Sequence, residues 1–378
     1  MNDLLDRTQG LPTRGRGLVR RMLSQDTLPS KQLENEVLLC CARTHADVKT
    51  LERLRTLLQQ DPDWQRLIQI ANSNGVVPLL YRNLSRSCPD AVPPTILAQL
   101  RESFLSNVQN SLLLTAELLK LVELFALHGV SAIPFKGPVL AAAVYKDLSL
   151  RQFSDLDVVV HRDDIFRAEE LLASQGYRAA TEKGVSSELN LDPEEVAYLG
   201  PSFYTFIHKD HGTRVDVQWR VTEKYFSFSL EDNQGSDRLV PVTVAGRLVL
   251  TFAPMDMLLI LCAHGTKHQW QGLKWICDVA ELVRAEKESI IWEKLQEEAS
   301  RQGASRMLNL GLYLARDLLG AEVPADVSNA IDKDFGRSWV VTRILSDLTN
   351  QPLRSWAALE KVGFYLKTMD RWQTSAAF

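Results

Sequence analysis

The feature that most constrains the fold is a change of pattern along the chain, from helical spacing to β-compatible spacing and back. Over residues 31–127 apolar side chains recur three and four positions apart, which is the period of an amphipathic helix. Over residues 128–252 short β-branched runs alternate with polar and glycine-containing turns, and after Pro254 the helical spacing returns. The sequence therefore predicts an α+β protein in which a small mixed β-sheet core lies between two helical regions.

The same change of pattern predicts the domain organisation. A chain of 378 residues is long enough for two or three structural units. Residues 1–30 are rich in Arg, Gly, Pro and Ser and are expected to form a flexible basic leader. Residues 31–127 are predicted to be an N-terminal helical region, residues 128–252 the α/β core and residues 253–378 a C-terminal helical region.

Within the predicted core, the order of elements can be read from the residues. Residues 130–135 and 156–160 have strand character, and residues 138–145 are a helix candidate with proline at its first position. Residues 202–208 and 213–219 are expected to pair as a hairpin because a polar turn separates them. Residues 239–244 and 247–251 are expected to do the same around Ala245-Gly246.

Two aspartates carry the strongest chemical signal. Asp155 and Asp157 lie two positions apart at the start of a predicted strand, so both side chains project from the same face. A third, Asp216, alternates with Val215 and Val217 in another predicted strand. If the two strands pair, three carboxylates converge, and only a bound cation is expected to make that crowding tolerable. Their oxygens suit Mg²⁺, with Mn²⁺ as an alternative, and such a cluster can hold two ions.

A glycine turn precedes this strand and suggests a phosphate contact. Lys136-Gly137-Pro138 follows one predicted strand and opens the helix candidate. Backbone N–H groups at a helix start attract phosphate, and glycine permits close approach. Lys136 and Arg151 can add positive charge for a triphosphate.

At these residues the chain resembles the nucleotidyltransferase superfamily, which has the DNA-polymerase-β-like fold, and most closely its bacterial group of uncharacterised nucleotidyltransferases. The resemblance covers roughly residues 105–285. It rests on Phe135-Lys136-Gly137, the stretch 148–151, Ser154-Asp155-Leu156-Asp157 with the valines after it, Val215-Asp216-Val217-Gln218-Trp219, and His264, His268, Trp275 and Asp278.

The resemblance implies transfer of a nucleoside monophosphate from an NTP, with Asp155, Asp157 and Asp216 as catalytic and metal-binding residues. It implies nucleotide contacts from Lys136, Gly137, Arg151 and Ser154, and from two histidines of the following helix. One departure is visible: the superfamily usually has Gly-Ser at the triphosphate, and here Pro138 follows Gly137.

The two histidines, His264 and His268, have alternative interpretations. They lie four positions apart on one helical face, as in a zinc pair, but the glutamate of the H-E-x-x-H motif is absent. They can instead line a nucleotide cleft beside Lys267, or simply pack. Asp278 is expected to be either an exposed helix charge or a partner of His264.

Three functions are compared. The favoured one is a transferase that moves AMP from ATP to a small molecule, peptide or protein. The alternative is a catalytically impaired module that binds nucleotide or protein. A polymerase-like or tRNA-modifying enzyme is disfavoured, because a net charge of −4 gives no general attraction to nucleic acid.

No apolar run is long enough for a membrane span, and the five cysteines lack zinc or disulfide spacing, so a cytoplasmic location is expected.

Overall fold

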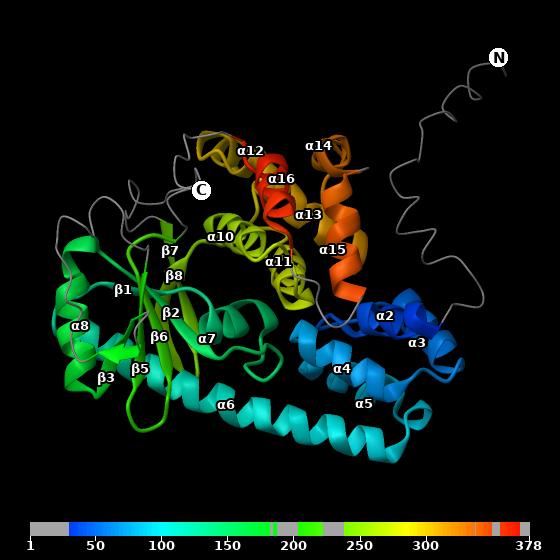
Figure 1. Cartoon of the computed structure of the whole chain (residues 1–378), viewed down its shortest axis with the longest axis horizontal. Coiled ribbons are helices and arrows are strands. Elements are labelled where there is room, and N and C mark those ends of the chain that lie inside the picture. Colours follow the sequence, from blue (N-terminus) through cyan, green and yellow to red (C-terminus); the bar gives the residue numbers. More distant parts are fainter. Residues whose placement is uncertain are drawn as a thin grey trace.

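The computed structural model describes residues 30–181, 184–186, 203–221, 238–336, 338–349 and 356–370. The leader expected over residues 1–30 lies outside them, apart from Ser30, where helix α2 begins. The predicted α+β class is confirmed: a small mixed sheet stands at one side, and helices cover it and extend away from it (Figure 1).

The N-terminal helices follow the predicted helical spacing, and two of them begin at aspartate caps. Asp47 accepts a hydrogen bond from the backbone N–H of Thr50, and Asp63 accepts one from Arg66. Each cap satisfies a donor that the helix itself leaves free. The helices are α2 (Ser30–Cys41), α3 (Val48–Leu58), α4 (Trp64–Asn74), α5 (Val77–Ser87), the 3₁₀ turn η1 (Pro89–Ala91) and α6 (Pro94–Leu127).

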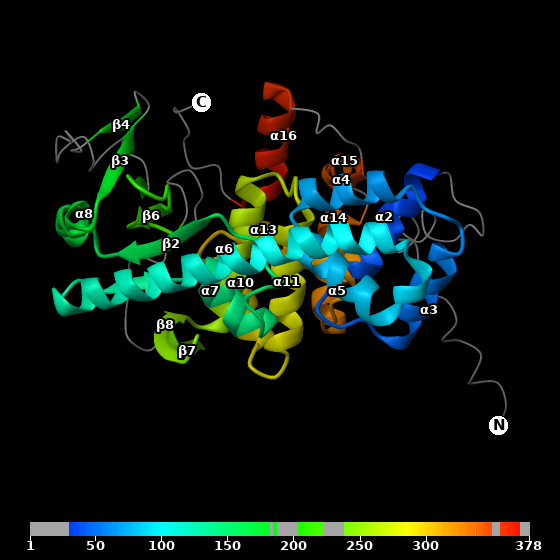
Figure 2. The same ribbon diagram turned by 90° about the horizontal axis from the view of Figure 1, so that it is seen from below.

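Helix α6 links the N-terminal helices to the sheet. Its 34 residues give a length of about 50 Å. Pro94 stands at its first turn, and Gly129, with φ +72°, follows its end. Its N-terminal half packs on α5, and its C-terminal half lies along the sheet (Figure 2). Residue 127, where the sequence divides the N-terminal helical region from the core, is the last residue of this helix. The helix itself packs on both parts.

The main sheet has six strands in the order β1-β2-β6-β5-β3-β4. Strands β2 and β6 are parallel and the other neighbours are antiparallel, which makes the sheet mixed, as predicted. The strands are β1 (Ala132–Pro134), β2 (Asp155–Val160), β3 (Tyr177–Thr181), β4 (Gly184–Ser186), β5 (Phe203–His208) and β6 (Arg214–Gln218).

The two faces of the sheet differ because side chains alternate along each strand. Leu156, Val158, Val215 and Val217 are fully buried and pack with the C-terminal half of α6 and with α8 (Ile165–Ser174), which follows the 3₁₀ turn η3 (Arg162–Asp164). The alternate residues of β2 and β6 face the other way, toward the C-terminal helices. The sheet thus has one apolar face and one polar face.

The second predicted hairpin is also confirmed and forms a separate two-stranded sheet of β7 (Leu239–Val244) and β8 (Arg247–Phe252). Ala245 and Gly246 have φ values of +46° and +82°, as a tight hairpin turn requires. The helix predicted over residues 138–145 is shorter than expected: α7 (Gly137–Leu140) runs into the π-helical turn η2 (Ala141–Tyr145).

The C-terminal helices share one hydrophobic core with the N-terminal helices, so regions far apart in sequence pack together. Among the described residues, no helix combines the length and the apolar character that crossing a bilayer needs. The helices are α10 (Pro254–Lys267), α11 (Leu273–Ala285), α12 (Trp292–Arg301), α13 (Ser305–Leu319), α14 (Ala325–Phe335), α15 (Trp339–Thr349) and α16 (Ala358–Thr368).

Candidate functional site

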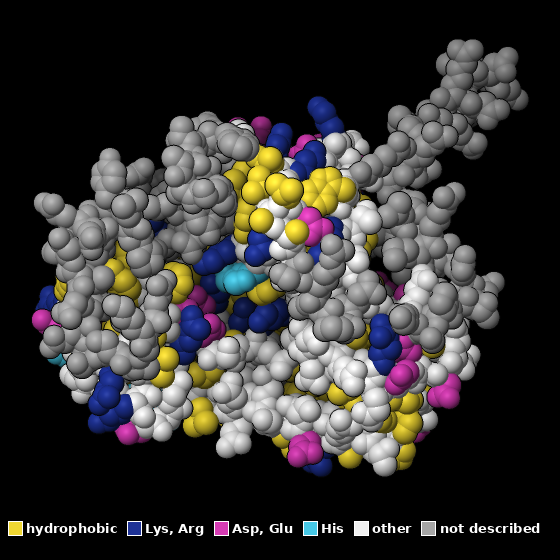
Figure 3. Space-filling model, viewed as in Figure 1, with side chains coloured by type: hydrophobic (Ala, Val, Ile, Leu, Met, Phe, Trp, Pro, Cys, Tyr) yellow, Lys and Arg dark blue, Asp and Glu magenta, His cyan; other side chains and the backbone are white. Residues whose placement is uncertain are grey.

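The polar face of the sheet and helices α10 and α11 enclose a cavity of about 300 Å³. On the surface it is a central hollow lined by Lys and Arg, with a histidine in its floor and acidic side chains at its edge (Figure 3). All nine residues singled out from the sequence line it: Lys136, Gly137, Arg151, Ser154, Asp155, Asp157, Asp216, His264 and His268. The structure thus brings the nine together, and their roles stay predictions.

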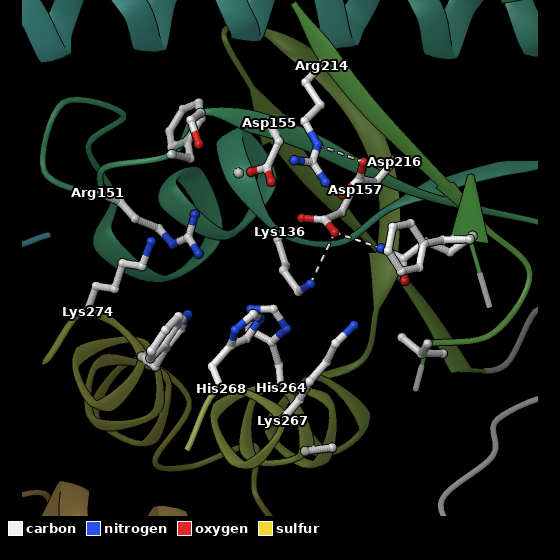
Figure 4. Close-up of a pocket in the computed structure, with 18 of the residues that line it drawn as sticks. Lys136, Arg151, Asp155, Asp157, Arg214, Asp216, His264, Lys267, His268 and Lys274 are labelled. Carbon is white, nitrogen blue, oxygen red and sulfur yellow. Dashed lines mark hydrogen bonds and ion pairs between the residues drawn. The ribbon is translucent and has the colours of Figure 1, made fainter. Parts of the chain in front are cut away.

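The three aspartates form one wall of this cavity (Figure 4). Strands β2 and β6 are parallel neighbours, and their register sets Asp157 directly beside Asp216. Asp155 lies two residues earlier on the same face and is partly exposed. Burial raises the pKa of the Asp155 carboxyl, and the charges of Asp157 and Asp216 raise it further.

Protein cations already balance two of these carboxylates. The Lys136 ammonium lies 3.1 Å from Oδ1 of Asp157, and the side-chain amide of Gln218 donates to the same oxygen at 2.7 Å. The Arg214 guanidinium donates two hydrogen bonds to the carboxylate of Asp216, each 3.1 Å long. The expectation that only a bound metal makes the crowding tolerable is therefore wrong, because lysine and arginine neutralise part of the charge.

The donor set still fits a hard divalent cation. Three carboxylates from adjacent strands share one wall, and among the described residues the Asp155 carboxylate has no hydrogen-bond partner. The like-charge effect on Asp155 marks a place where a cation would relieve repulsion. Within the described part of the chain, no three His, Cys, Asp or Glu side chains are arranged as a ready metal cluster. Asp157 and Asp216 are instead paired with Lys136 and Arg214.

The glycine turn lies beside the aspartates. Gly137 has φ +52°, a conformation that favours glycine, and a Cβ there would lie 3.4 Å from the backbone oxygen of Asp155. The turn therefore brings the backbone close to β2, as the sequence suggested. Ser154 is exposed at the cavity rim.

Arg151 points into the cavity from a buried network. Its Nε and one terminal nitrogen donate to the two oxygens of Asp278, at 2.8 and 2.9 Å, and the Tyr145 hydroxyl donates to Asp278 at 2.7 Å. Asp278 is 1% exposed. Both expectations for Asp278 are wrong: it is neither an exposed charge nor the partner of His264, because Arg151 and Tyr145 occupy its oxygens.

Helices α10 and α11 supply the opposite wall. His268 stacks on Trp275, with 4.7 Å between ring centroids and 14° between planes, and His264 meets both rings edge-on. Burial and neighbouring lysines lower the pKa of His268 to about 4, and burial with Lys136 lowers that of His264 well below its usual range. Both rings are therefore neutral at pH 7 and can act as hydrogen-bond partners.

Several cavity residues were missed by the sequence reasoning. Arg214 and Gln218 occupy the same strand face as Asp216, so alternation along β6 could have identified them. Lys274 gave no local signal, since only the packing of α11 against the sheet brings it to the cavity. Two further lining residues, Lys267 and Trp275, had been named from the sequence, and the others are Gln152, Phe153, Phe203, Arg220, Val221 and Ala263.

Comparison with known proteins is consistent with this geometry. The family model described as "Uncharacterised nucleotidyltransferase" matches residues 60–320, which is more than half of the chain and contains every residue of the cavity. No curated protein and no solved structure matches the chain. The chain therefore belongs to the family of uncharacterised nucleotidyltransferases.

Proposed function

We propose that this protein transfers AMP from ATP, in a Mg²⁺-dependent reaction, to a hydroxyl or similar group of a small molecule, peptide or protein. Mn²⁺ is an alternative metal, and we place the protein in the bacterial, DNA-polymerase-β-like branch of nucleotidyltransferases. A cytoplasmic location belongs to the same proposal and is supported by five free cysteines. No nucleic acid and no membrane takes part.

One observation carries the proposal: the β2–β6 register that sets Asp157 beside Asp216, with Asp155 on the same face of the same cavity. The charges of the lining residues support it, since six Lys or Arg side chains accompany three Asp side chains. A nucleoside triphosphate with a divalent cation complements both groups, because phosphates match the excess positive charge and the cation matches the carboxylates.

In the proposed reaction, an acceptor oxygen forms a bond to the α-phosphorus of ATP. The bond from that phosphorus to the oxygen bridging to the β-phosphate breaks, and pyrophosphate leaves with the electron pair. Asp216 takes the acceptor's proton. Asp155, Asp157 and Asp216 would hold Mg²⁺, which when bound supplies charge stabilisation for the attacking and leaving oxygens. Lys136 and Arg151 lie in the cavity where they can neutralise charge developing on the phosphates.

The test is release of pyrophosphate from ATP and Mg²⁺ by the purified full chain, with a panel of hydroxyl-bearing acceptors. Asp155→Asn with Asp157→Asn is expected to lower the rate by about 100-fold or more. The control changes two exposed aspartates, Asp90→Asn with Asp326→Asn, and should leave the rate unchanged. Normal release from the first double variant would end the assignment.

A second candidate is a module that binds nucleotide or a partner without turnover. It is favoured by the ion pair that Arg214 makes with Asp216 and by Pro138, which stands where the superfamily usually has serine. Calorimetry separates the candidates: nucleotide binding that does not depend on Mg²⁺, with no turnover on the acceptor panel, would favour the module.

A further inference from the structure

The cations of the cavity are not equally balanced. Lys136 pairs with Asp157, Arg214 with Asp216, and Arg151 with Asp278. Among the described residues, no carboxylate lies within ion-pair distance of the Lys274 ammonium. The Lys274 ammonium lies over the ring of Trp275, with Nζ 5.3 Å from the ring centroid. Among the described residues Lys274 therefore makes no direct ion pair, and Asp278 and Asp155 attract its charge only from a longer distance.

Arg151 and Lys274 lie side by side at one end of the cavity, and both point into it (Figure 4). Burial lowers the pKa of Lys274, and the charge of Arg151 lowers it further. Two neighbouring cations in a partly buried place repel each other, and an anion between them would remove that cost. Since Asp278 occupies two of the five N–H donors of Arg151, the others can contact a ligand.

Both side chains are held by parts of the chain far away in sequence. The stem of Lys274 packs over Gly75 at the end of α4, where an added Cβ would lie 2.8 Å from Cδ of the lysine. The buried side chain of Asn74 accepts a hydrogen bond from the backbone N–H of Leu273, at 3.0 Å. Arg151 is fixed by Asp278 of α11. The helical regions thus set the position of both cations.

We propose that Arg151 and Lys274 form a polyphosphate-binding subsite of the cavity, and that Asp278 and Tyr145 are positioning residues that fix the Arg151 guanidinium. The ligand chemistry is a chain of phosphates, from a nucleoside triphosphate or from free polyphosphate. The nucleotide form of the proposal rests on the proposed function, because it identifies which wall of the cavity holds the triphosphate.

The test is calorimetric titration of the full chain with inorganic triphosphate, ATP and adenosine. Lys274→Met is expected to weaken binding of triphosphate and of ATP by about tenfold, since one charge-assisted contact is lost. Adenosine binding should not change. Lys294→Met removes an exposed lysine of α12 outside the cavity and is the matched control, expected to bind all three as the unaltered chain does. Unchanged triphosphate affinity in Lys274→Met would overturn the subsite.

A positioning role for Asp278 and a purely electrostatic role predict opposite changes in triphosphate affinity. Asp278→Asn removes a negative charge near the subsite, so a purely electrostatic role would strengthen triphosphate binding. If Asp278 positions Arg151, triphosphate binding weakens, because the bidentate ion pair that fixes the guanidinium is lost. Tyr145→Phe should weaken binding less, in the same direction. Tighter binding by a folded Asp278→Asn variant would contradict the positioning role.

The outcomes also separate this subsite from the proposed function. If triphosphate binds through Lys274 but no pyrophosphate is released from ATP on any acceptor, the subsite stands and the transferase proposal fails. If ATP turns over and Lys274→Met leaves both affinity and turnover unaltered, the transferase proposal stands and the subsite fails. Affinity for ATP without affinity for inorganic triphosphate would also overturn the subsite.

Discussion

Lys136 and Arg214 balance two of the three carboxylates that the sequence assigned to a metal, Asp157 and Asp216. Arg214 holds both oxygens of Asp216, and its side chain is 47% exposed, so it can leave at modest cost. A divalent cation bound at this wall, as proposed, would compete with the guanidinium for the oxygens of Asp216. Arg214 therefore acts as a built-in counter-ion of the wall that β2 and β6 form.

This competition predicts that Arg214→Gln binds Mn²⁺ more tightly than the unaltered chain, by about threefold to tenfold, because a cation close to the site is removed. Titration of free Mn²⁺ by electron paramagnetic resonance measures the affinity directly. Arg101→Gln, which changes an exposed arginine of α6, is the control and should bind Mn²⁺ normally. Equal or weaker affinity in Arg214→Gln would show that the arginine organises the site rather than competing for it.

A second prediction concerns the neutral ring of His268. Its pKa is about 4 in the folded chain, against an ordinary value of 6.5, mainly because of burial and secondly because of Lys267. Between these values the unfolded chain binds a proton that the folded chain does not, so this residue's contribution to stability is lost as pH falls below 6.5. Between pH 7.5 and pH 5, the free energy of unfolding should therefore fall by roughly 2 kcal/mol more in the unaltered chain than in His268→Gln.

Urea unfolding of both proteins at the two pH values measures this difference. Nuclear magnetic resonance of the ring provides a second check, since the His268 signals should not titrate near pH 6. A ring that titrates near its ordinary value would contradict the buried, neutral state. If the free energy of unfolding depends on pH equally in the two proteins, His268 does not contribute to the loss of stability at low pH.

Individual residues were predictable from the sequence where the chemistry follows strand alternation. Asp155 and Asp157 had to share a face, and the pairing of their strand with that of Asp216 was a single further assumption. Lys274 and the partners of Asp278 were not predictable, because they depend on how α11 packs against the sheet. Burial of a carboxylate in the C-terminal helices leaves no mark in the local pattern.

Among the elements, α4 and α11 are joined more closely than their separation in sequence suggests. The buried Asn74 accepts from the first residue of α11, and its amide donates to the carbonyl of Ile70 in α4. The free N–H groups at a helix start need such acceptors. The end of one helix thus orients the start of the other, which carries Lys274 and Trp275.

Asn74→Ala is therefore expected to lower the free energy of unfolding by about 1–3 kcal/mol, since the buried N–H of Leu273 loses its acceptor. It should also weaken triphosphate binding, because the start of α11 is no longer held. Denaturant unfolding and calorimetry measure the two effects. Asn72→Ala, in the same helix but exposed, is the matched control and should change neither. If Asn74→Ala loses stability but binds triphosphate with full affinity, then α4 does not influence binding through the start of α11.

Most elements could be predicted because their ends carry local signals. The β7–β8 turn, the break after α6 and the aspartate caps are set by a few residues each. The short α7 and its π-helical continuation could not be predicted. Their geometry depends on packing against α11 and β7, and Lys146 closes the turn with φ +56°.

In the whole molecule, the helical regions build part of the site and are not appendages of the sheet. The N-terminal and C-terminal helices share one core, and that core places α10 and α11 over the polar face of the sheet (Figure 1). The sequence predicted an α/β unit between helices, with His264 and His268 of the following helix as nucleotide contacts, but it did not predict that α11 brings Lys274 to the cavity. Long-range packing of this kind has no period that a single sequence can reveal.

The most direct test of the account locates the metal. Crystals of the full chain with Mn²⁺ and a non-hydrolysable ATP analogue would show the ion by its anomalous scattering. We expect density about 2.1 Å from carboxylate oxygens of Asp155, Asp157 and Asp216, with Arg214 moved off Asp216. Bound analogue with no metal at these aspartates, or with the ion held elsewhere, would contradict the nucleotidyltransferase mechanism proposed for this cavity.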